Sequence, residues 1–543
     1  MRKTERNARK EKKNRIFHAV NTAFVVCTPL IMLAYLIRVL TPEGVGQYSY
    51  ASSMITYFTV FAALGFGYYA RRELVKERDN AYGRSCLFWD IFLCRLVPTL
   101  MALGINVILS LTGAYGEKSF LMLVMSSNVV AVAIDVGFIF RDSDDYGKIV
   151  LRNVAVKLVT MLLTFLLVRS ENDVWKYELI HYGAAIAGNI ALWVGVPGLI
   201  VRVRLSDLRP MRHLPETLRL FVPTIVLSVY TMLDKTLIGA ITHSDAENGY
   251  YEMADVVVRT ALTAVIAVNA ARLPRIEREL RNGHAARLKE EIYASADFVW
   301  FAGAAVASIL SATVCNLGAV YFGGSYAETE KILAALSFLP LVMGLGNTVG
   351  AQYLIPTGQD GKFTAAVLVG AFVNISLNIP MIIFLGAFGA AMATVIAECA
   401  ATAMMLAFAR RGLRVSRLLA GAIKNTLAAF AAFAAAYALS LVLPQAVGYG
   451  ILAFVSGMAA YLLALVVLAD KYLYSRMGAI VARVRSGRAL RKAKRRAQDV
   501  SDHSLHTEGA VYTEHEEADA PAATVSDEYS DDAASENSHD CDA

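Results

Sequence analysis

The chain has 543 residues, of which 56% are hydrophobic and 18% are charged, and its formal net charge is +6. The apolar residues form recurring runs of about 20 between Ile16 and Asp470, a length that matches a hydrocarbon core of roughly 30 Å and excludes an ordinary soluble domain. The 6 cysteines show no CxxC or Cys/His spacing, which argues against a zinc site and a disulfide framework.

A basic segment occupies residues 1–15, ahead of the first apolar run. That run is too long for the core of a signal peptide, and no A-x-A cleavage site follows it. We therefore expect it to remain in the protein as the first membrane span.

Fourteen membrane-spanning helices are predicted along the chain, each as an apolar run bounded by polar or basic residues. The fold class is therefore an all-α integral membrane protein. Six helices form a predicted N-lobe at 16–201, six a C-lobe at 219–409, and two more follow at 425–470. The predicted spans are 16–37, 47–69, 86–112, 118–140, 149–169, 177–201, 219–242, 254–274, 296–321, 333–356, 363–386, 388–409, 425–443 and 448–470.

The loops between these helices alternate in basic content. Most of the even-numbered loops carry a cluster of Lys and Arg, whereas the odd-numbered loops are nearly free of them. The loop at 357–362 is an exception, because its only basic residue is Lys362. Short basic loops stay on the cytoplasmic side, so both termini are predicted to be cytoplasmic in a multi-pass protein of the cell membrane. The clusters lie at 71–84, 202–212, 272–289 and 410–417.

Two segments of opposite charge follow the last predicted span. The basic segment 471–498 is expected to lie along anionic membrane lipids. The segment 499–543 has no Lys or Arg and many acids, so it cannot bury enough apolar surface to fold. A solvated cytoplasmic extension is favoured over a docking site for another protein.

A short repeat points to two related halves. Residues 46–51 and 249–254 both fit G-x-Y-x-x-A, and each opens a predicted helix that ends in a basic cluster. The offset of about 203 residues preserves helix orientation, which predicts parallel repeats around an axis along the membrane normal. A cavity between two such lobes is the natural transport path.

Ionisable residues inside the predicted spans are the candidate functional groups, because each costs about 2.5–3.5 kcal/mol to insert at mid-membrane. Some can be ion pairs between helices, or can reach the interface from a helix end. Two deep cations in one lobe, Arg95 and Lys157, repel each other unless they share water or an anionic ligand, which favours a place in the cavity. Glu398 lies alone at the centre of its helix and is a candidate proton or cation coupling site. The remaining candidates are Asp90, Asp135, Asp234, Lys235 and Arg259.

Several stretches between residues 16 and 470 resemble the polysaccharide-exporter branch of the MATE-like superfamily, the Wzx-type O-antigen and capsule flippases. Residues 38–48 are similar to the pattern R-x-L-x-P-x-x-x-G-x-Y, and residues 234–254 to D-K-x-x-x-G followed by G-x-Y-x-x-A. Further likeness lies at 134–157 and 352–391. Gly137 and Arg141 depart from the family pattern, which expects an aromatic residue and a glutamine there.

The resemblance implies a flippase that moves an undecaprenyl-diphosphate-linked oligosaccharide from the cytoplasmic to the outer leaflet by alternating access. It implies a transporter with no catalytic residues, cofactor, metal or nucleic acid, driven by a proton gradient, a sodium gradient or the membrane potential. Polysaccharide assembly proteins are the implied protein partners. The diphosphate contacts we expect are Arg38, Arg95, Lys157, Lys235 and Arg259, and the coupling or gating residues are Asp135, Asp234 and Glu398.

Two other functions remain open. A multidrug or small-molecule exporter of the same superfamily would favour cationic substrates and should show more acids than bases in its cavity. A membrane polymerase or glycosyltransferase would need a large external loop with carboxylates, and the external loops here are mostly short.

Overall fold

The computed structural model describes residues 24, 27–77, 80–140, 146–321, 327–442, 447–470, 472–474 and 478. The predicted basic N-terminus, the start of the first span, Arg141, nearly all of 471–498 and the whole of 499–543 lie outside this range. Residues Met1–Leu473 form one compact unit, and the description below concerns that unit.

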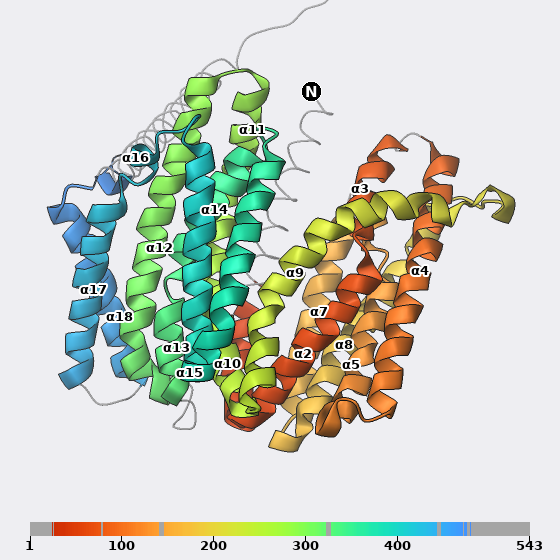
Figure 1. Cartoon of the computed structure of the whole chain (residues 1–543), viewed down its shortest axis with the longest axis horizontal. Coiled ribbons are helices and arrows are strands. Elements are labelled where there is room, and N and C mark those ends of the chain that lie inside the picture. The colour runs from red at the N-terminus through yellow and green to blue at the C-terminus, as the bar shows by residue number, and fades with distance from the viewer. Residues whose placement is uncertain are drawn as a thin grey trace, which may run out of the picture. The chain divides into compact units, whose positions relative to one another are not determined.

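Helices make up all the regular structure of the described residues (Figure 1). A helical segment at Cys27–Val39 comes first. The first bundle then contains α2 (Pro42–Ala63), α3 (Phe66–Lys76), α4 (Ala81–Leu111), α5 (Ser119–Ala133), α6 (Gly137–Phe140), α7 (Tyr146–Leu167) and α8 (Val174–Trp193). The second contains α9 (Leu214–Thr242), α10 (Asp245–Ala270), α11 (Leu273–Arg281), α12 (Ala285–Tyr321), α13 (Ala327–Leu336), α14 (Leu339–Val349) and α15 (Asp360–Ala409). The chain continues through α16 (Val415–Leu418), α17 (Ala422–Val442) and α18 (Val447–Val467).

Ten helices within the described residues are long and apolar enough to cross a membrane. Large apolar side chains point outward from them, including Phe372, Phe384 and Phe430, with exposed fractions of 72%, 82% and 72%. Apolar surface on this scale is stable in lipid and not in water. The chain is therefore an all-helical, multi-pass membrane protein, as predicted.

Breaks divide several of the predicted spans. The backbone at Gly386 has φ 59°, which interrupts α15 next to the predicted boundary at 387. Two other breaks were not predicted: α2 ends in the left-handed residues Leu64 and Gly65, and α5 ends at Ala133 with a non-helical stretch before α6. A residue with positive φ cannot continue an α-helix, which ends the helix at Leu64 and at Gly386. The break after α5 has no such residue, since Ile134 has φ −92°.

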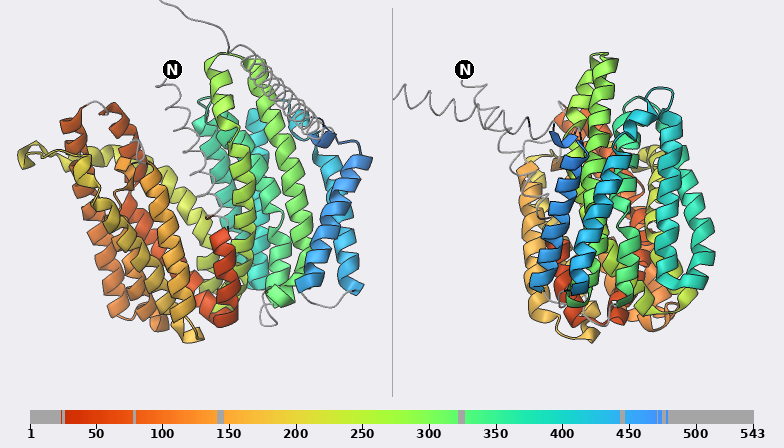
Figure 2. Two further views of the ribbon diagram at one scale, coloured as in Figure 1. Left: turned by 180° about the vertical axis from the view of Figure 1, so that it is seen from behind. Right: turned by 90° about the vertical axis from the view of Figure 1, so that its left-hand side faces the viewer.

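Figures 1 and 2 show the two bundles side by side, with α9 running from the α3 and α4 end of the first bundle to α10 and α15 in the second. The last two helices pack on α12, where the Tyr461 hydroxyl lies 2.8 Å from both the Phe301 carbonyl oxygen and Asn425 Oδ1. The bundles meet where α2 and α10 begin, which is the lower end of Figure 1 and is called the crossing end below.

The crossing end is built on the repeated motif. A methyl group added at Gly46 would lie 1.6 Å from the carbonyl oxygen of Asp245, and one added at Gly249 would lie 2.0 Å from that of Pro42. The two contacts are the same contact repeated, because Gly46 and Gly249 are as far apart in the sequence as Pro42 and Asp245. Ser49 and Glu252 share this separation of 203 residues, and the Ser49 hydroxyl donates to Glu252 Oε2 at 2.7 Å. A local two-fold axis therefore passes between α2 and α10.

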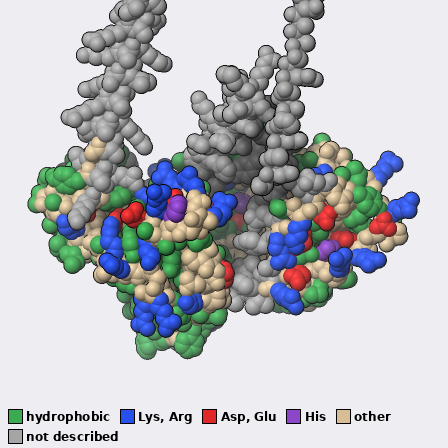
Figure 3. All heavy atoms as spheres, turned by 90° about the horizontal axis from the view of Figure 1, so that it is seen from above, with side chains coloured by type: hydrophobic (Ala, Val, Ile, Leu, Met, Phe, Trp, Pro, Cys, Tyr) green, Lys and Arg blue, Asp and Glu red, His purple; other side chains and the backbone are tan. Residues whose placement is uncertain are grey.

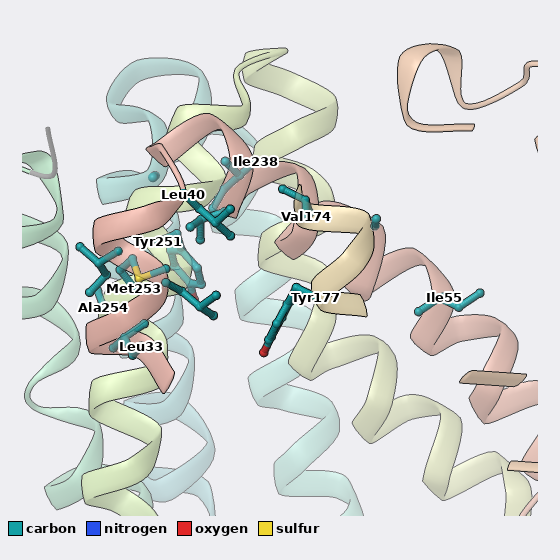
Figure 4. Packing of buried hydrophobic residues seen from close by; sticks show 14 of the residues in the cluster. Leu33, Leu40, Ile55, Val174, Tyr177, Ile238, Tyr251, Met253 and Ala254 are labelled. Atoms are coloured by element: carbon teal, nitrogen blue, oxygen red, sulfur yellow. The ribbon is translucent and has the colours of Figure 1, made fainter. Parts of the chain in front are cut away.

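One apolar core joins the bundles at this end. Its buried side chains come from the segment Cys27–Val39, from α2 and α8, and from α9 and α10 (Figure 4). An ion pair between Lys118 Nζ and Asp245 Oδ1, 2.9 Å long, also links the first bundle to the second. The core members labelled in Figure 4 are Leu33, Leu40, Ile55, Val174, Tyr177, Ile238, Tyr251, Met253 and Ala254.

Candidate functional site

A cavity of about 640 Å³ lies mainly within the first bundle and reaches α10. One wall is apolar and comes from the segment Cys27–Val39 with Met32, Leu33 and Leu36. The facing residues of α4, α7, α8 and the break after α5 are largely polar. Those polar residues are Arg95, Asp135, Arg152, Asn153, Lys157, Thr160, His181 and Asn189.

Of the cations predicted to contact the diphosphate, Lys157 lines the cavity without being engaged by a neighbouring side chain that the structure describes. It is partly buried on α7, and it makes no hydrogen bond or ion pair with another described residue. A buried ammonium group without a counter-ion is costly, so an anion in the cavity would stabilise it.

Arg95 also lines the cavity, but its guanidinium is already engaged. Nη2 donates to the carbonyl oxygens of Ala133 at 2.6 Å and Asp135 at 2.8 Å, and the side chain is only 6% exposed. The last carbonyls of a helix have no partner within the helix, so Arg95 satisfies the end of α5. Its main effect is to hold the break in this span, while Nε has no hydrogen-bond partner among the described residues.

Arg152 is a cavity cation that was not selected from the sequence. Its Nη1 donates to Asn189 Oδ1 at 2.5 Å and lies 4.0 Å from Asp135 Oδ1. Asn189 in turn donates to the carbonyl of Ala131 at 2.8 Å. From the sequence, Arg152 looks like an interfacial residue, because an arginine near a helix end usually lies at the membrane interface. The one signal for a functional role was its position beside Asn153 in a stretch that resembles the family.

Asp135 lies in the break between α5 and α6, where its Oδ1 accepts a hydrogen bond from the Gly137 amide at 2.8 Å. The side chain is half exposed and faces the cavity. It therefore helps to terminate one helix and start the next while staying within reach of Arg152.

Lys235 and Arg259 belong to a separate cluster of buried charges. Lys235 Nζ lies 2.6 Å from Glu252 Oε2 and 3.2 Å from Asp255 Oδ2. Arg259 Nε lies 2.6 Å from Asp255 Oδ1. Neither cation lines the cavity, whereas Glu252 does. The sequence could have identified Glu252 and Asp255 as neighbours of Arg259, because positions 252, 255 and 259 share one face of α10.

Asp234 is the centre of a polar cluster between α9, α10 and α15. Its carboxylate accepts hydrogen bonds from Tyr251 at 2.6 Å, Thr394 at 2.6 Å, Asn378 at 2.7 Å and Asn374 at 3.3 Å. The side-chain oxygens of Asn374 and Asn378 are buried and have no hydrogen-bond partner among the described residues. Such oxygens are acceptors left free for a donor or a cation.

The other predicted residues lie elsewhere. Arg38 is exposed, Glu398 is partly buried on the second half of α15, and neither lines the cavity. Asp90 contacts the linker before α9 and not the cavity: its Oδ1 accepts from the Arg209 amide at 2.7 Å, and its Oδ2 lies 3.3 Å from His213 Nε2. The described residues hold no group of three or more His, Cys, Asp or Glu arranged for a metal ion.

Known proteins of similar sequence are transporters. Two proteins named "Putative O-antigen transporter" match the chain, one from Escherichia coli (strain K12) at 25% identity and one from Shigella dysenteriae at 20%. The first match covers 74% of this chain and 96% of the relative, and the second covers 72% and 97%.

Solved structures show the same fold at low identity. The lipid II flippase MurJ in an inward closed conformation aligns with a TM-score of 0.67 and 15% identity, covering 83% of this chain and 98% of MurJ. A multidrug resistance MATE family transporter of the MOP superfamily, in an inward-facing conformation, aligns with a TM-score of 0.59 and 15% identity, covering 74% and 98%.

The matching family is described as "Polysaccharide biosynthesis protein", and the match spans residues 12–278, which include every helix of the first bundle and the motif at Gly249. Together with the fold and the transporter relatives, this match confirms the resemblance seen in the sequence. The chain is a membrane transporter of MurJ- and MATE-like fold, and its residues 12–278 match the polysaccharide biosynthesis protein family.

Proposed function

We propose that the protein is a flippase that carries an undecaprenyl-diphosphate-linked oligosaccharide from the cytoplasmic to the outer leaflet. The observation that supports this most directly is the cavity, in which an apolar wall faces Arg152 and Lys157 across about 640 Å³. A lipid-linked sugar needs both surfaces, since its diphosphate requires cations and the adjacent prenyl chain requires apolar side chains.

The charge of the cavity favours an anionic cargo over the cationic substrates of a multidrug exporter. Three cations line it, whereas the two acidic residues, Asp135 and Glu252, already accept contacts from the protein. We assign diphosphate contact to Lys157 and Arg152, and positioning of the break after α5 to Arg95. Lys235 and Arg259 are held by Glu252 and Asp255 in this conformation, so they would become contacts only after a rearrangement.

The orientation we propose places the crossing end outside and both termini in the cytoplasm. The opposite end carries many Lys and Arg side chains, as its surface in Figure 3 illustrates. Basic loops are retained on the cytoplasmic side. With this orientation, outward movement of an anionic phosphate is favoured by about 2.3 kcal/mol per charge per 100 mV of membrane potential.

Coupling is assigned to the Asp234 cluster. A carboxylate with four donors and two free amide oxygens beside it can exchange those donors for a cation. Because the cluster joins α9 and α10 to α15, occupancy would change how these helices pack, and Asp135 would gate the cavity from the break after α5.

Proteoliposomes test this proposal. The purified protein is reconstituted with a fluorescent polyprenyl-diphosphate oligosaccharide, and a membrane-impermeant enzyme reports how much reaches the opposite leaflet. We expect flipping by the wild type, and at least about a tenfold loss in Lys157→Ala and Arg152→Ala, because each loses a charge-assisted contact of about 1.5–3 kcal/mol.

The matched control is Lys331→Ala, which removes an exposed cation whose one ion pair among the described residues is with the neighbouring Glu328 at 2.9 Å. It should flip the lipid at the wild-type rate. A wild-type rate equal to that of protein-free vesicles would refute the flippase, and normal flipping in both cavity variants would remove Arg152 and Lys157 from the site.

A further inference from the structure

A buried acid at the crossing end has no place in the mechanism described so far. Glu178 lies on α8, one turn from its start, and is 1% exposed. Its Oε2 makes no hydrogen bond with a described residue, and Glu178 forms no ion pair with one. Most buried carboxylates have hydrogen-bond partners and a counter-ion, so the burial of Glu178 needs an explanation.

The charges nearby do not balance Glu178. The cluster on α9 and α10 contains two cations, Lys235 and Arg259, and two acids, Glu252 and Asp255, that are already paired with them. Glu252 lies close enough for its charge to act on Glu178. Both cations are therefore already engaged by other acids, and Asp234 next to Lys235 adds a further carboxylate to this region.

Neither Lys157 of α7 nor Lys176 of α8 forms an ion pair with Glu178. The charges of Glu178 and Glu252 both act on Tyr48 of α2. The ring of Tyr48 packs edge to face on Tyr177 at 5.6 Å. Tyr182 and His181 follow on α8 itself, Asp173 precedes α8 and pairs with Lys176 at 2.6 Å, and α5 contains no titratable residue. On α7, Lys157 lies beside His181.

Glu178 and Glu252 belong to different bundles. Glu252 also accepts the hydrogen bond from Ser49 across the local two-fold axis, so the second acid is part of the contact that joins the bundles. If both carboxyls were ionised here, their repulsion and the loss of water around Glu178 would oppose the closed crossing end.

We propose that Glu178 is a proton-binding site whose occupation closes the crossing end of the transporter. A proton from the water outside binds a carboxyl oxygen of Glu178 as the bundles come together, and the neutral carboxyl is then buried at much lower cost. When the bundles separate at this end, the group meets water again and releases the proton. This inference rests on the proposed alternating access and orientation, but not on the identity of the cargo.

Linkage gives the sign of the effect. The closed state holds one more proton than the open state, so raising the pH favours opening at the crossing end. With one proton involved, the ratio of closed to open molecules falls by up to about tenfold per pH unit.

Distance measurements between spin labels test the inference without any substrate. The labels are placed at Glu117 of the first bundle and Glu328 of the second, both exposed, in full-length protein whose 6 native cysteines are replaced, in lipid nanodiscs. We expect the short-distance population to decline as the pH rises in the wild type, and to persist at every pH in Glu178→Gln, which mimics the protonated acid.

Glu171→Gln is the matched control, since it removes an exposed acid just before α8 and should follow the wild-type titration. Glu178→Asp keeps a titratable group and should remain pH-dependent, so it replaces Glu178→Gln if that variant does not fold. A wild-type distribution that does not change with pH, or Glu178→Gln titrating as the wild type does, would overturn the inference. A pH response in a protein that flips no lipid would instead count against the proposed cargo alone.

Discussion

Arg95 and Lys157 show how two cations at similar depth come to have different roles. Arg95 is committed to two carbonyls at the end of α5, whereas Lys157 has no described partner and faces the cavity. The sequence identified both as intramembrane charges because the position of a residue along a span can be predicted from the apolar run that contains it. The partners were not readable, since they come from helices far apart in the chain.

We predict that Arg95→Lys lowers stability by about 1–3 kcal/mol, because the lysine ammonium does not extend as far as Nη2, the arm of the guanidinium fork that donates to both carbonyls. Thermal unfolding in detergent measures the change. Arg169→Lys is the control, since Arg169 is exposed and its side chain donates only to the nearby Leu166 carbonyl at 3.0 Å. Equal unfolding temperatures for Arg95→Lys and the wild type would show that the break does not depend on the fork.

Besides Arg152, sequence reasoning missed three acids at the crossing end. Glu178, Glu252 and Asp255 lie within two residues of the starts of the predicted spans 177–201 and 254–274, where a charge is ordinarily assigned to the membrane interface. They are buried because α2 and α10 pack backbone to backbone beside them. That contact joins helices far apart in the chain, so the pattern within either helix does not reveal it.

At the scale of elements, the linker before α9 is fixed to the first bundle by a chain of hydrogen bonds. Tyr69 of α3 contacts His213 Nδ1 at 2.6 Å, and Asp90 of α4 contacts both His213 and the Arg209 amide. Nearby, the Tyr82 hydroxyl donates to Asp207 at 2.5 Å, which lowers the pKa of that carboxyl, so this contact is lost only as the pH falls through the lowered value.

Asp90→Asn should loosen this linker, because the amide cannot replace both carboxylate contacts without a rearrangement. Limited trypsin digestion of the purified protein reads this out, since the linker contains Arg202, Arg204, Arg209 and Arg212. We expect cleavage there several times faster than in the wild type. Glu77→Gln changes a partly exposed acid just after α3 and should be cleaved at the wild-type rate. If other contacts hold the linker, Asp90→Asn would also be cleaved at the wild-type rate.

Helix breaks were only partly predictable. A glycine between two apolar runs marked the break in α15, because a run of 50 residues is too long for one span. The break after α5 has no such signal: it depends on Asp135 accepting from Gly137 and on Arg95 from another helix. The break at Leu64 and Gly65 lies inside the predicted span 47–69, and no charged residue marks it before Arg71.

For the molecule as a whole, the joint between the bundles depends on two glycines. We predict that Gly249→Ala forces α10 away from α2, because the new methyl group would meet the Pro42 backbone, which cannot move aside as a side chain can. The variant should unfold at lower temperature and react faster with a thiol reagent at a cysteine replacing Ser49.

Gly104→Ala on α4 is the matched control, since a methyl group there meets nothing within 4 Å. It should be neutral or stabilising by roughly 0.5–1 kcal/mol, as expected for alanine in a helix interior. Identical behaviour of the two alanine variants would mean that the bundles are not held by this contact.

The same contact has a consequence for ancestry. Because each half offers one glycine and receives the other half's carbonyl, the joint has the form of an isologous interface between identical subunits. A chain of half this length, carrying a single copy of the motif, could associate with a second copy of itself through that surface. Fusion of two such genes would then free the halves to diverge, one toward a cargo chamber and the other toward the Asp234 cluster, while neither could alter its glycine alone.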